Sequence, residues 1–497
     1  MIRYTKTTIL AVALLFVAAA CEEPVQEIFD GVTPEELAQS TDPALIDVLK
    51  ASAYQRIIGT WGGHNSLWSM HEVASDEMVI AHKGADWEDG GQWIRMHRHE
   101  YNAQEEAINN GWGYCYTAIG DMNLLIQQNP NVTALVAELK ILRSLVYLWL
   151  IDAYGNVPIV LSTDTDATPP TRTRADVFTF IESSILDNIS ELPTENTKTT
   201  LNQWSARAIL AKLYLNAEVY TGSARWADAE AQIDLIINSG VFSLENNFFS
   251  NFVTNNENSS ENILTLPYDE NNANGFNIAQ MTGHYSTQAT FDLQDSPWNG
   301  YASLEEFYNA YETNDARRNS FLAGPQFALD GSPLTDDNAE ATDPDGPGLN
   351  FTPEINELAP NSFRQAGVRV GKFEYRVGAT PNLSNDFPIF RYGDILLMKA
   401  EVMHRQGNTA GALNYVNQIR SRSGIAALTT LTDDILLAER GREMFAEGYR
   451  RSDLIRFGKY NDAWWAKDAS NPSVNIFPIP QGQLDANPDL VQNPGYN

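Results

Sequence analysis

Two tryptophans, Trp87 and Trp93, stand close together in a glycine-containing segment of the chain. Planar hydrogen-bonding side chains accompany them, namely Asp86, Asp89 and Gln92. A sugar presents C–H faces and a rim of hydroxyls, so flat rings flanked by carboxylates and amides are suited to bind it. The segment is therefore a candidate carbohydrate-binding loop. The alternative interpretation is that both rings fill the core beneath the loop.

Other rings and two arginines are weaker candidates for the same chemistry. In order of position they are Trp61, Trp68, Tyr285, Phe291, Trp298, Tyr301, Arg364 and Arg369. A single aromatic ring in a large globular protein more often belongs to the core, and isolated arginines are more often solvated charges. We therefore rank these residues below the tryptophan pair.

Carboxylates beside tryptophan are also found in glycosidase clefts, where two carboxylates lie about 5–10 Å apart. Nothing selects one pair among the 64 acidic residues, and the sequence contains no G-x-S-x-G, H-E-x-x-H or phosphate-loop motif. His97 and His99 alternate as zinc ligands do, but no third ligand follows at a recognisable spacing. We predict no catalytic residue and no metal ligand among them.

Calcium is the one cofactor that the sequence leaves open. Asp343-Pro344-Asp345-Gly346 supplies oxygen atoms of the kind that calcium prefers. Its spacing lacks the remainder of a calcium-binding loop. We therefore predict no cofactor, with structural calcium as the alternative at this segment.

The charge balance excludes some classes of partner. The chain carries 64 Asp plus Glu against 33 Lys plus Arg, a net charge of −31. Such a charge repels nucleic acid and anionic lipid, so DNA and RNA are not expected partners.

Residues 1–20 have the features of an export signal. A basic segment precedes an apolar run from Ile9 to Ala20, which is too short to cross a ~30 Å hydrocarbon core as a helix. The run ends in Ala-Ala-Ala before Cys21, which resembles the lipobox of bacterial lipoproteins. We predict that Cys21 is lipidated and that residues 21–40 form a tether. The alternative is an ordinary signal peptide followed by a chance cysteine.

Two segments repeat each other with the spacing of a 34-residue tetratricopeptide (TPR) unit. Small residues occupy the positions where two antiparallel helices approach each other, namely Ala217 and Ala229 in the first repeat and Ala400 and Ala412 in the second. Larger apolar residues stand at the other matched offsets: Leu213, Tyr220, Ile233 and Ile236, then Leu396, Met403, Val416 and Ile419. The repeats predict helical hairpins that form a scaffold.

Residues 243–385 have a different composition, with many Asn, Asp, Gly, Pro and Ser residues and little helical periodicity. Short strands are expected at 263–266 and 369–375. Residues 330–348 are acidic and rich in Pro and Gly, so we expect a solvated mobile loop there. The whole excursion should lie over the helical scaffold, where loops commonly carry binding sites.

Seven segments, taken in order, resemble the SusD/RagB family of Bacteroidetes outer-membrane lipoproteins. They are Trp112–Asn123, Tyr154–Pro158, Ala206–Leu215, Phe387–Asp394 with Lys399–Glu401, Asn417–Arg420, Glu439–Glu443 with Glu447–Arg451, and Phe477–Pro480 with Asn493–Gly495. The resemblance covers nearly the whole chain. It implies a mostly α, SusD-like fold in which four TPR-type hairpins support an irregular, loop-rich region with few short strands. It places the two further hairpins in helices around residues 43–57, 100–128 and 134–190.

The resemblance also completes the expected organisation of the chain. The expected parts are a lipoprotein signal peptide (1–20), a tether (21–40), an N-terminal SusD-like helical region (41–242), a loop-rich ligand-binding excursion (243–385) and a C-terminal TPR hairpin with the RagB/SusD segment (386–497). In family members the region between the first TPR helices contributes stacking aromatics, which favours the binding interpretation of Trp87 and Trp93.

By the same resemblance, the protein is expected on the extracellular face of the outer membrane, anchored by its lipid and partnered by a SusC-like TonB-dependent transporter. The implied function is capture of an oligo- or polysaccharide, such as the glucans laminarin and starch or a fructan. Fold-level analogy does not establish the ligand. An oligopeptide-capturing, RagB-like binder is the alternative, and a glycoside hydrolase is a further one with less support.

Overall fold

The computed structural model describes residues 43–61, 63–164 and 168–496. Helices make up most of the ordered structure and the strands are short, as the sequence predicts. The scaffold helices are α3 (Pro43–Ile58), α4 (Leu67–Val73), α5 (Gln92–Arg98), α6 (Glu106–Gln128), α7 (Thr133–Tyr154), α8 (Arg174–Leu186), α9 (Gln203–Leu215), α10 (Ala217–Thr221), α11 (Trp226–Asn238), α15 (Tyr392–Arg405), α16 (Thr409–Arg422), α17 (Asp433–Met444), α18 (Arg450–Arg456) and α19 (Gln481–Ala486).

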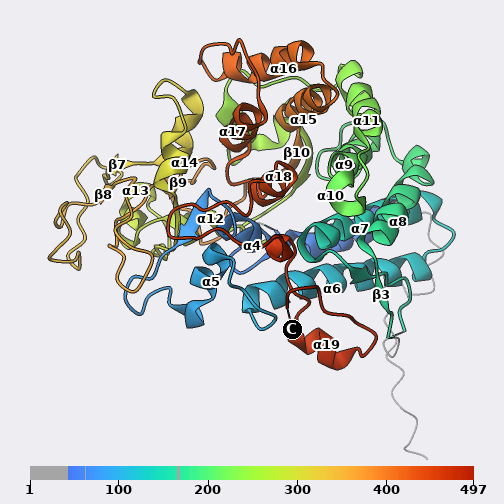
Figure 1. Ribbon diagram of the computed structural model, residues 1–497, viewed down its shortest axis with the longest axis horizontal. Coiled ribbons are helices and arrows are strands. Elements are labelled where there is room, and N and C mark those ends of the chain that lie inside the picture. Colours follow the sequence, from blue (N-terminus) through green and yellow to red (C-terminus); the bar gives the residue numbers. More distant parts are fainter. Residues whose placement is uncertain (1–42, 62, 165–167, 497) are drawn as a thin grey trace, which may run out of the picture.

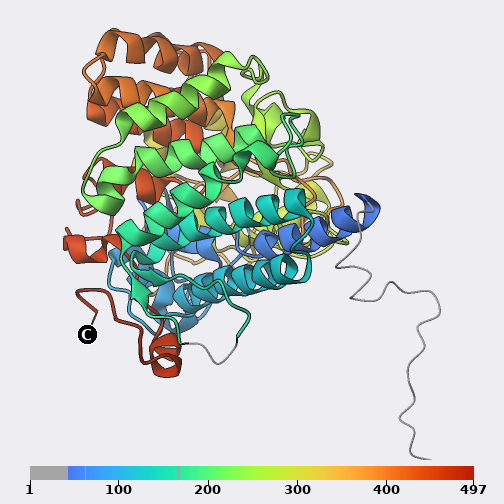
Figure 2. The same ribbon diagram turned by 90° about the vertical axis from the view of Figure 1, so that its right-hand side faces the viewer.

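Pairs of helices pack side by side and build the scaffold. α3 packs on α6, α7 on α8, α9 on α11, and α15 on α16. Figure 2 shows the helices in successive, roughly parallel rows, from the blue and cyan α3 and α6 to the orange α15 and α16. The helical pairs predicted from the two sequence repeats are therefore confirmed.

The small residues of the repeats are buried in the scaffold, and in the second repeat Ala400 and Ala412 belong to one apolar cluster with Val416 and Ile419. Ala217, Ala229, Ala400 and Ala412 are completely buried, and the larger residues at matched offsets are buried with them, except for the half-buried Met403. A small side chain at these positions lets two helices approach closely, because no methylene group separates their backbones. The repeat spacing thus encodes the close packing of each pair.

The loop-rich excursion contains three short helices and most of the strands. The helices are α12 (Ile278–Thr282), α13 (Gln288–Phe291) and α14 (Glu305–Asn309). The strands of the chain form antiparallel pairs: β1 (Met78–Ile80) with β5 (Tyr301–Ser303), β4 (Asn262–Leu266) with β10 (Phe387–Arg391), β2 (Val157–Pro158) with β3 (Thr171–Arg172), β6 (Phe321–Leu322) with β9 (Arg369–Val370), and β7 (Gly324–Pro325) with β8 (Asn350–Phe351). Figure 1 shows the excursion, in yellow and olive, beside the helical rows.

Residues 330–348 are mostly exposed, as the sequence predicts, and they also carry backbone pairing that the sequence does not predict. The segment folds back on itself as a paired hairpin, in which the Asp336 N–H donates to the Pro347 carbonyl at 2.8 Å and the Leu349 N–H donates to the Leu334 carbonyl at 2.9 Å. Asp336 is almost completely buried. The segment is therefore a solvated hairpin with one buried carboxylate.

Buried ion pairs form a second core in the C-terminal part of the chain. The Arg391 guanidinium, with no exposed surface, contacts Glu443 at 2.6 Å, Glu447 at 2.7 Å and Glu261 at 3.1 Å. Arg317, equally buried, contacts the Glu439 carboxylate at 2.7 Å. Each charge is matched by several partners, which is the arrangement that burial of ions requires.

A turn between α17 and α18 joins this core to helix α4, far back in the chain. The Gly448 N–H donates to Glu72 at 2.6 Å, and the Ala446 N–H donates to Glu77 at 3.0 Å. Burial, together with the neighbouring Glu77, raises the pKa of Glu72. Trp68, also on α4, donates its indole N–H to the Ala446 carbonyl at 3.1 Å.

In the part of the chain that the structure describes, no helix combines the length and the apolar surface that a membrane crossing needs. The predicted signal peptide, the lipidated Cys21 and the tether fall within residues 1–42 and lie outside the described residues.

Candidate functional site

Aromatic candidates from distant segments converge around one histidine. The ring centroid of His64 lies 5.1 Å from that of Trp87, 5.3 Å from Trp93, 6.1 Å from Trp298 and 5.9 Å from Tyr301. We call these five residues the aromatic cluster. Burial lowers the pKa of His64 to about 4, against the opposing effect of Asp89, so the imidazole is neutral at physiological pH.

Several of the predicted binding rings belong to the core. Trp93 and Tyr301 have no exposed surface, and Trp68 is buried against Tyr301. The Trp93 indole donates to Asp89 at 2.8 Å, and the Tyr301 hydroxyl lies 2.7 Å from Ser69 Oγ. A ring without an exposed face cannot stack on a sugar, so we correct the binding prediction for these three rings.

Three other candidates are also structural. Trp61 is buried and stacks on Trp149, with ring centroids 5.0 Å apart. Gln92, buried at the start of α5, accepts a hydrogen bond from the Ala107 N–H at 3.3 Å. The Arg369 guanidinium is fully buried and donates to backbone carbonyls, so it is neither a solvated charge nor a fork for sugar hydroxyls.

Trp298 is the member of the cluster that faces solvent. It is 37% exposed, whereas Trp87 beside it is 9% exposed. The Trp87 indole N–H donates to the Trp298 carbonyl at 2.6 Å. A Cβ atom at Gly300 would lie 2.3 Å from the Trp87 ring, so only glycine allows that ring to pack against the strand. Trp87 therefore supports the backbone that presents Trp298.

Four polar side chains from the loops around Trp298 form a connected set, which we call the polar shelf. It consists of Asp86, Tyr285, Arg364 and Asp336. The Tyr285 hydroxyl donates to Asp86, and the Arg364 guanidinium lies 4.4 Å above the Tyr285 ring. Arg364 also donates to the Asp336 carboxylate at 3.2 Å. Burial raises the pKa of Asp86, and the charges of Lys83 and Arg364 oppose that change. The shelf offers a stacked guanidinium and a carboxylate, and the Asn299 amide, one residue after Trp298, donates to the Arg364 carbonyl at 2.7 Å.

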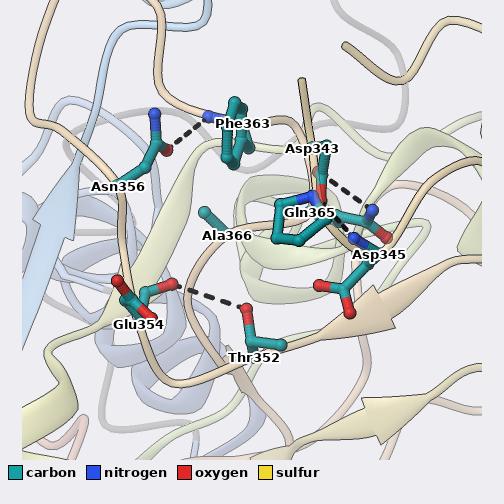
Figure 3. Close-up of a pocket in the computed structure, with 9 residues that line it drawn as sticks. Asp343, Asp345, Thr352, Glu354, Asn356, Phe363, Gln365 and Ala366 are labelled. Carbon is teal, nitrogen blue, oxygen red and sulfur yellow. Dashed lines mark hydrogen bonds between the residues drawn. The ribbon is translucent and has the colours of Figure 1, made fainter. Parts of the chain in front are cut away.

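A small cavity lies beside Arg364 in the chain, between the 343–345 turn and the segment 352–366 (Figure 3). Its volume is about 80 Å³, enough for two or three water molecules but well below the ~300–1,000 Å³ of typical ligand sites. Gln365 donates to Asp343 at 2.9 Å, and the Phe363 N–H donates to Asn356 at 2.8 Å. The cavity is too small to hold a sugar ring.

The same turn contains Asp343–Gly346, the segment at which the sequence leaves structural calcium as an alternative. Asp343 already accepts hydrogen bonds from the Gln365 amide and from the Asp345 N–H. Among the residues that the structure describes, no group of three or more His, Cys, Asp or Glu side chains is placed to hold a metal ion. Calcium binding stays a prediction that the structure does not test.

Two family models match the chain. A model described as starch-binding and associating with the outer membrane matches residues 41–215, and the model of the SusD family matches residues 366–496. Together the matched segments span more than half of the chain. The chain belongs to the SusD family.

Known proteins agree with this assignment. The starch-binding protein SusD of Bacteroides thetaiotaomicron is 26% identical to this SusD-family chain, covering 88% of the chain and 86% of the relative. A SusD superfamily protein from Parabacteroides distasonis matches with a TM-score of 0.74 at 19% identity, covering 92% of this chain and 100% of that structure. A laminarin-binding SusD-like protein matches with a TM-score of 0.73 at 23% identity, covering 91% and 99%. These structures confirm the SusD-like fold.

The matches also show why parts of the site are hard to recognise from sequence. Trp87 lies within the first matched segment of this SusD-family chain, but Trp298, Tyr285 and Arg364 lie between the two segments. His64, the centre of the aromatic cluster, was not a candidate at all. Its position between two tryptophans in Trp61-Gly-Gly-His-Asn-Ser-Leu-Trp68 was the available signal.

Proposed function

We propose that this SusD-family protein binds glycan at the surface formed by Trp298 and the polar shelf, without hydrolysing it. The observation that carries the proposal is the exposed indole of Trp298, fixed by the hydrogen bond from the buried Trp87 to its carbonyl. One face of a sugar ring would stack on this indole. Arg364 and Asp86 would meet the hydroxyls at its rim.

The ligand class is supported by the relatives. One is named a starch-binding protein and another a laminarin-binding protein. A glucan of either kind, or a fructan, is electrically neutral. That suits a site where the exposed carboxylates Asp86 and Asp89 lie near the ring, because an anionic sugar would meet their repulsion.

Delivery to a SusC-like TonB-dependent transporter and lipid anchoring at Cys21 complete the proposed function. Both come from the family resemblance. We expect the protein to co-purify with a SusC-like barrel from detergent-solubilised outer membranes, and we expect Cys21→Ser to release it from the membrane. Recovery without the barrel, when the same extract contains one, would count against the transporter. Continued anchoring of Cys21→Ser would count against the lipid.

Trp298→Ala tests the binding surface. We expect it to weaken laminarihexaose or maltohexaose binding by about 10- to 100-fold, a stacking-sized loss of roughly 1–3 kcal/mol by analogy with base–aromatic platforms. The melting temperature should change little, because Trp298 is partly exposed and the hydrogen bond from Trp87 goes to its backbone carbonyl. Isothermal titration calorimetry measures the affinity. Tyr114→Ala on α6 is the control, because Tyr114 is similarly exposed at 41%.

Two results would redirect the proposal. Equal glucan affinity of Trp298→Ala and wild type would remove the site from this surface. Tight binding of an oligopeptide mixture, with no response to any neutral glycan, would favour the RagB-like alternative. Incubation of the purified protein with the same glucans should release no reducing ends, and their release would identify a hydrolase.

A further inference from the structure

A polar groove lies on the scaffold between the end of α5 and the loop that follows α18. Its volume is about 750 Å³, within the ~300–1,000 Å³ range of small-molecule sites. Trp464 lines it together with Arg98, Glu100, Asp468 and Asn471. One indole ring among a guanidinium, carboxylates and an amide is again the set of groups that suits a sugar.

The ring of Trp464 is held by its neighbours. The Lys467 Nζ atom lies 3.9 Å from the ring centroid, and the His99 ring meets it edge-on at 5.1 Å. His99 in turn stacks on Tyr460 at 4.1 Å and bonds to Ser470 at 3.1 Å. A ring fixed in this way loses little conformational freedom when a ligand binds.

Three charged side chains of the groove, those of Arg98, Glu100 and Asp468, are largely free to meet a ligand. Arg98 uses only its Nε atom, which donates to the Ala466 carbonyl at 3.3 Å. Within the described part of the chain, the side chains of Glu100 and Asp468 have no hydrogen-bond partner. Arg364 on the polar shelf differs, because its guanidinium is already paired with a carboxylate.

Helix α5 connects the groove to the aromatic cluster. The cluster residue Trp93 lies at its second position, and Arg98 is its last residue. Seven helical residues span about 10 Å. A polymer long enough to contact both surfaces at once would bind more tightly overall, without new contacts at either.

We infer that the groove at Trp464 is a second glycan-binding site, separate from Trp298. Its residues are independent of the first surface, but its ligand class, a neutral oligosaccharide, rests on the proposed function. Trp464 supplies the stacking face, and Arg98, Glu100 and Asp468 bind hydroxyls around it.

The test uses the double variant Arg98→Ala/Asp468→Ala, because both side chains are exposed and the ring stays in place. Arg172→Ala/Asp485→Ala is the control, since it removes the same two charges at exposed positions on β3 and α19. Laminarihexaose and laminarin are titrated into the wild type, the Trp298→Ala variant, each double variant, and the groove variant combined with Trp298→Ala. Thermal melts verify folding.

We expect Trp298→Ala to keep a residual laminarihexaose-binding site, which the added groove substitutions abolish. Alone, the groove variant should lower laminarin affinity at least 10-fold, and the control pair should leave it unchanged. The inference is overturned when Trp298→Ala alone abolishes all binding and the groove variant matches the control. Loss of binding in the groove variant with Trp298→Ala unaffected would instead overturn the first surface and leave the groove. If the wild type bound neither laminarihexaose nor laminarin, the ligand class proposed for both sites would be overturned.

Discussion

The aromatic cluster and the C-terminal ionic core differ in their exposure to solvent and in how their polar groups are paired. The cluster is built from neutral rings and leaves one ring, Trp298, open to solvent. The ionic core contains fully buried guanidinium and carboxylate groups, such as Arg391 and Glu443, that pair almost entirely with each other. One region is shaped so that it can accept a partner, and the other has already satisfied its polar groups internally.

This difference between the two regions shows which of them contains the family motifs. Glu439-Arg-Gly-Arg-Glu443 and Glu447-Gly-Tyr-Arg-Arg451 are among the segments that carry the family resemblance. Most of their charges lie in the ionic core, and none of them belongs to the aromatic cluster. These motifs therefore specify the fold, while the exposed ring comes from a part of the chain that neither family model matches.

Breaking the ionic core should have the largest effect. Arg391→Met removes the guanidinium shared by Glu261, Glu443 and Glu447. These buried carboxylates then have one cation fewer to share, although Arg317, Arg422 and Lys372 still pair with them. We expect a loss of about 3–5 kcal/mol in the free energy of unfolding, measured by urea denaturation. Glycan affinity per folded molecule should be unchanged. The exposed Arg172→Met is the control, and equal stability of the two variants would show that the network contributes little.

Removing the buried ring of the cluster should act in the same way. Trp93→Ala deletes a fully buried indole, and we expect a loss of roughly 3–5 kcal/mol in the free energy of unfolding. Glycan affinity per folded molecule should persist. Trp298→Ala should do the opposite and lower glycan affinity at nearly unchanged stability. Reduced glycan affinity at unchanged stability would restore Trp93 as a binding residue.

Acid should weaken the ionic core specifically. Burial alone would raise the pKa of Glu439, but Arg317 and Arg442 lower it to about 2, from an ordinary value of 4.5. A lowered folded-state pKa stabilises the protein above pH 4.5, and this contribution, on the order of 3 kcal/mol, is lost as the pH falls toward 2. Glu439→Gln resembles the protonated form. Its urea midpoint should lie below that of the wild type at pH 7 and approach it at pH 2 to 3; a constant difference would contradict the assignment.

The scaffold between the two regions should respond least. Ala400→Leu forces extra methylenes into the contact between α15 and α16, and we expect a loss of about 1–3 kcal/mol. Ala410→Leu, at an exposed position of α16, should change the melting temperature little. Equal melting temperatures for both variants would mean that Ala400 does not face a partner helix.

Local spacing made the scaffold predictable. Ala217, Ala229, Ala400 and Ala412 reveal the helix pairs because the contacts recur at fixed offsets within about 34 residues. The site depends on longer distances in the chain. Trp87 and Trp298 meet only in the folded molecule, and which of the two keeps an exposed face depends on Gly300 and on the strand pair β1–β5. Residue type identified the rings as aromatic candidates but did not separate the buried ones from Trp298.

The buried charges escaped prediction for a related reason. Glu439, Arg440 and Glu443 have the composition of a solvated helix face. Their burial requires partners from other segments: Arg317 and Arg391 for the two glutamates, and Asp394 and Asp453 for Arg440. A sequence pattern contains no sign of such partners. The resemblance to the family marked these residues as characteristic without indicating what they do.

The contact between α4 and the turn at Ala446–Gly448 limits the order in which the molecule can fold. Glu72 and Glu77 receive their backbone donors from residues about 370 positions later in the chain. Until that turn is synthesised, the carboxyl groups of Glu72 and Glu77 lack the backbone N–H donors that they bind in the folded protein. Native pairings across such separations form slowly. A nascent chain of this protein must therefore stay unaggregated for most of its synthesis before its first helices can complete their packing.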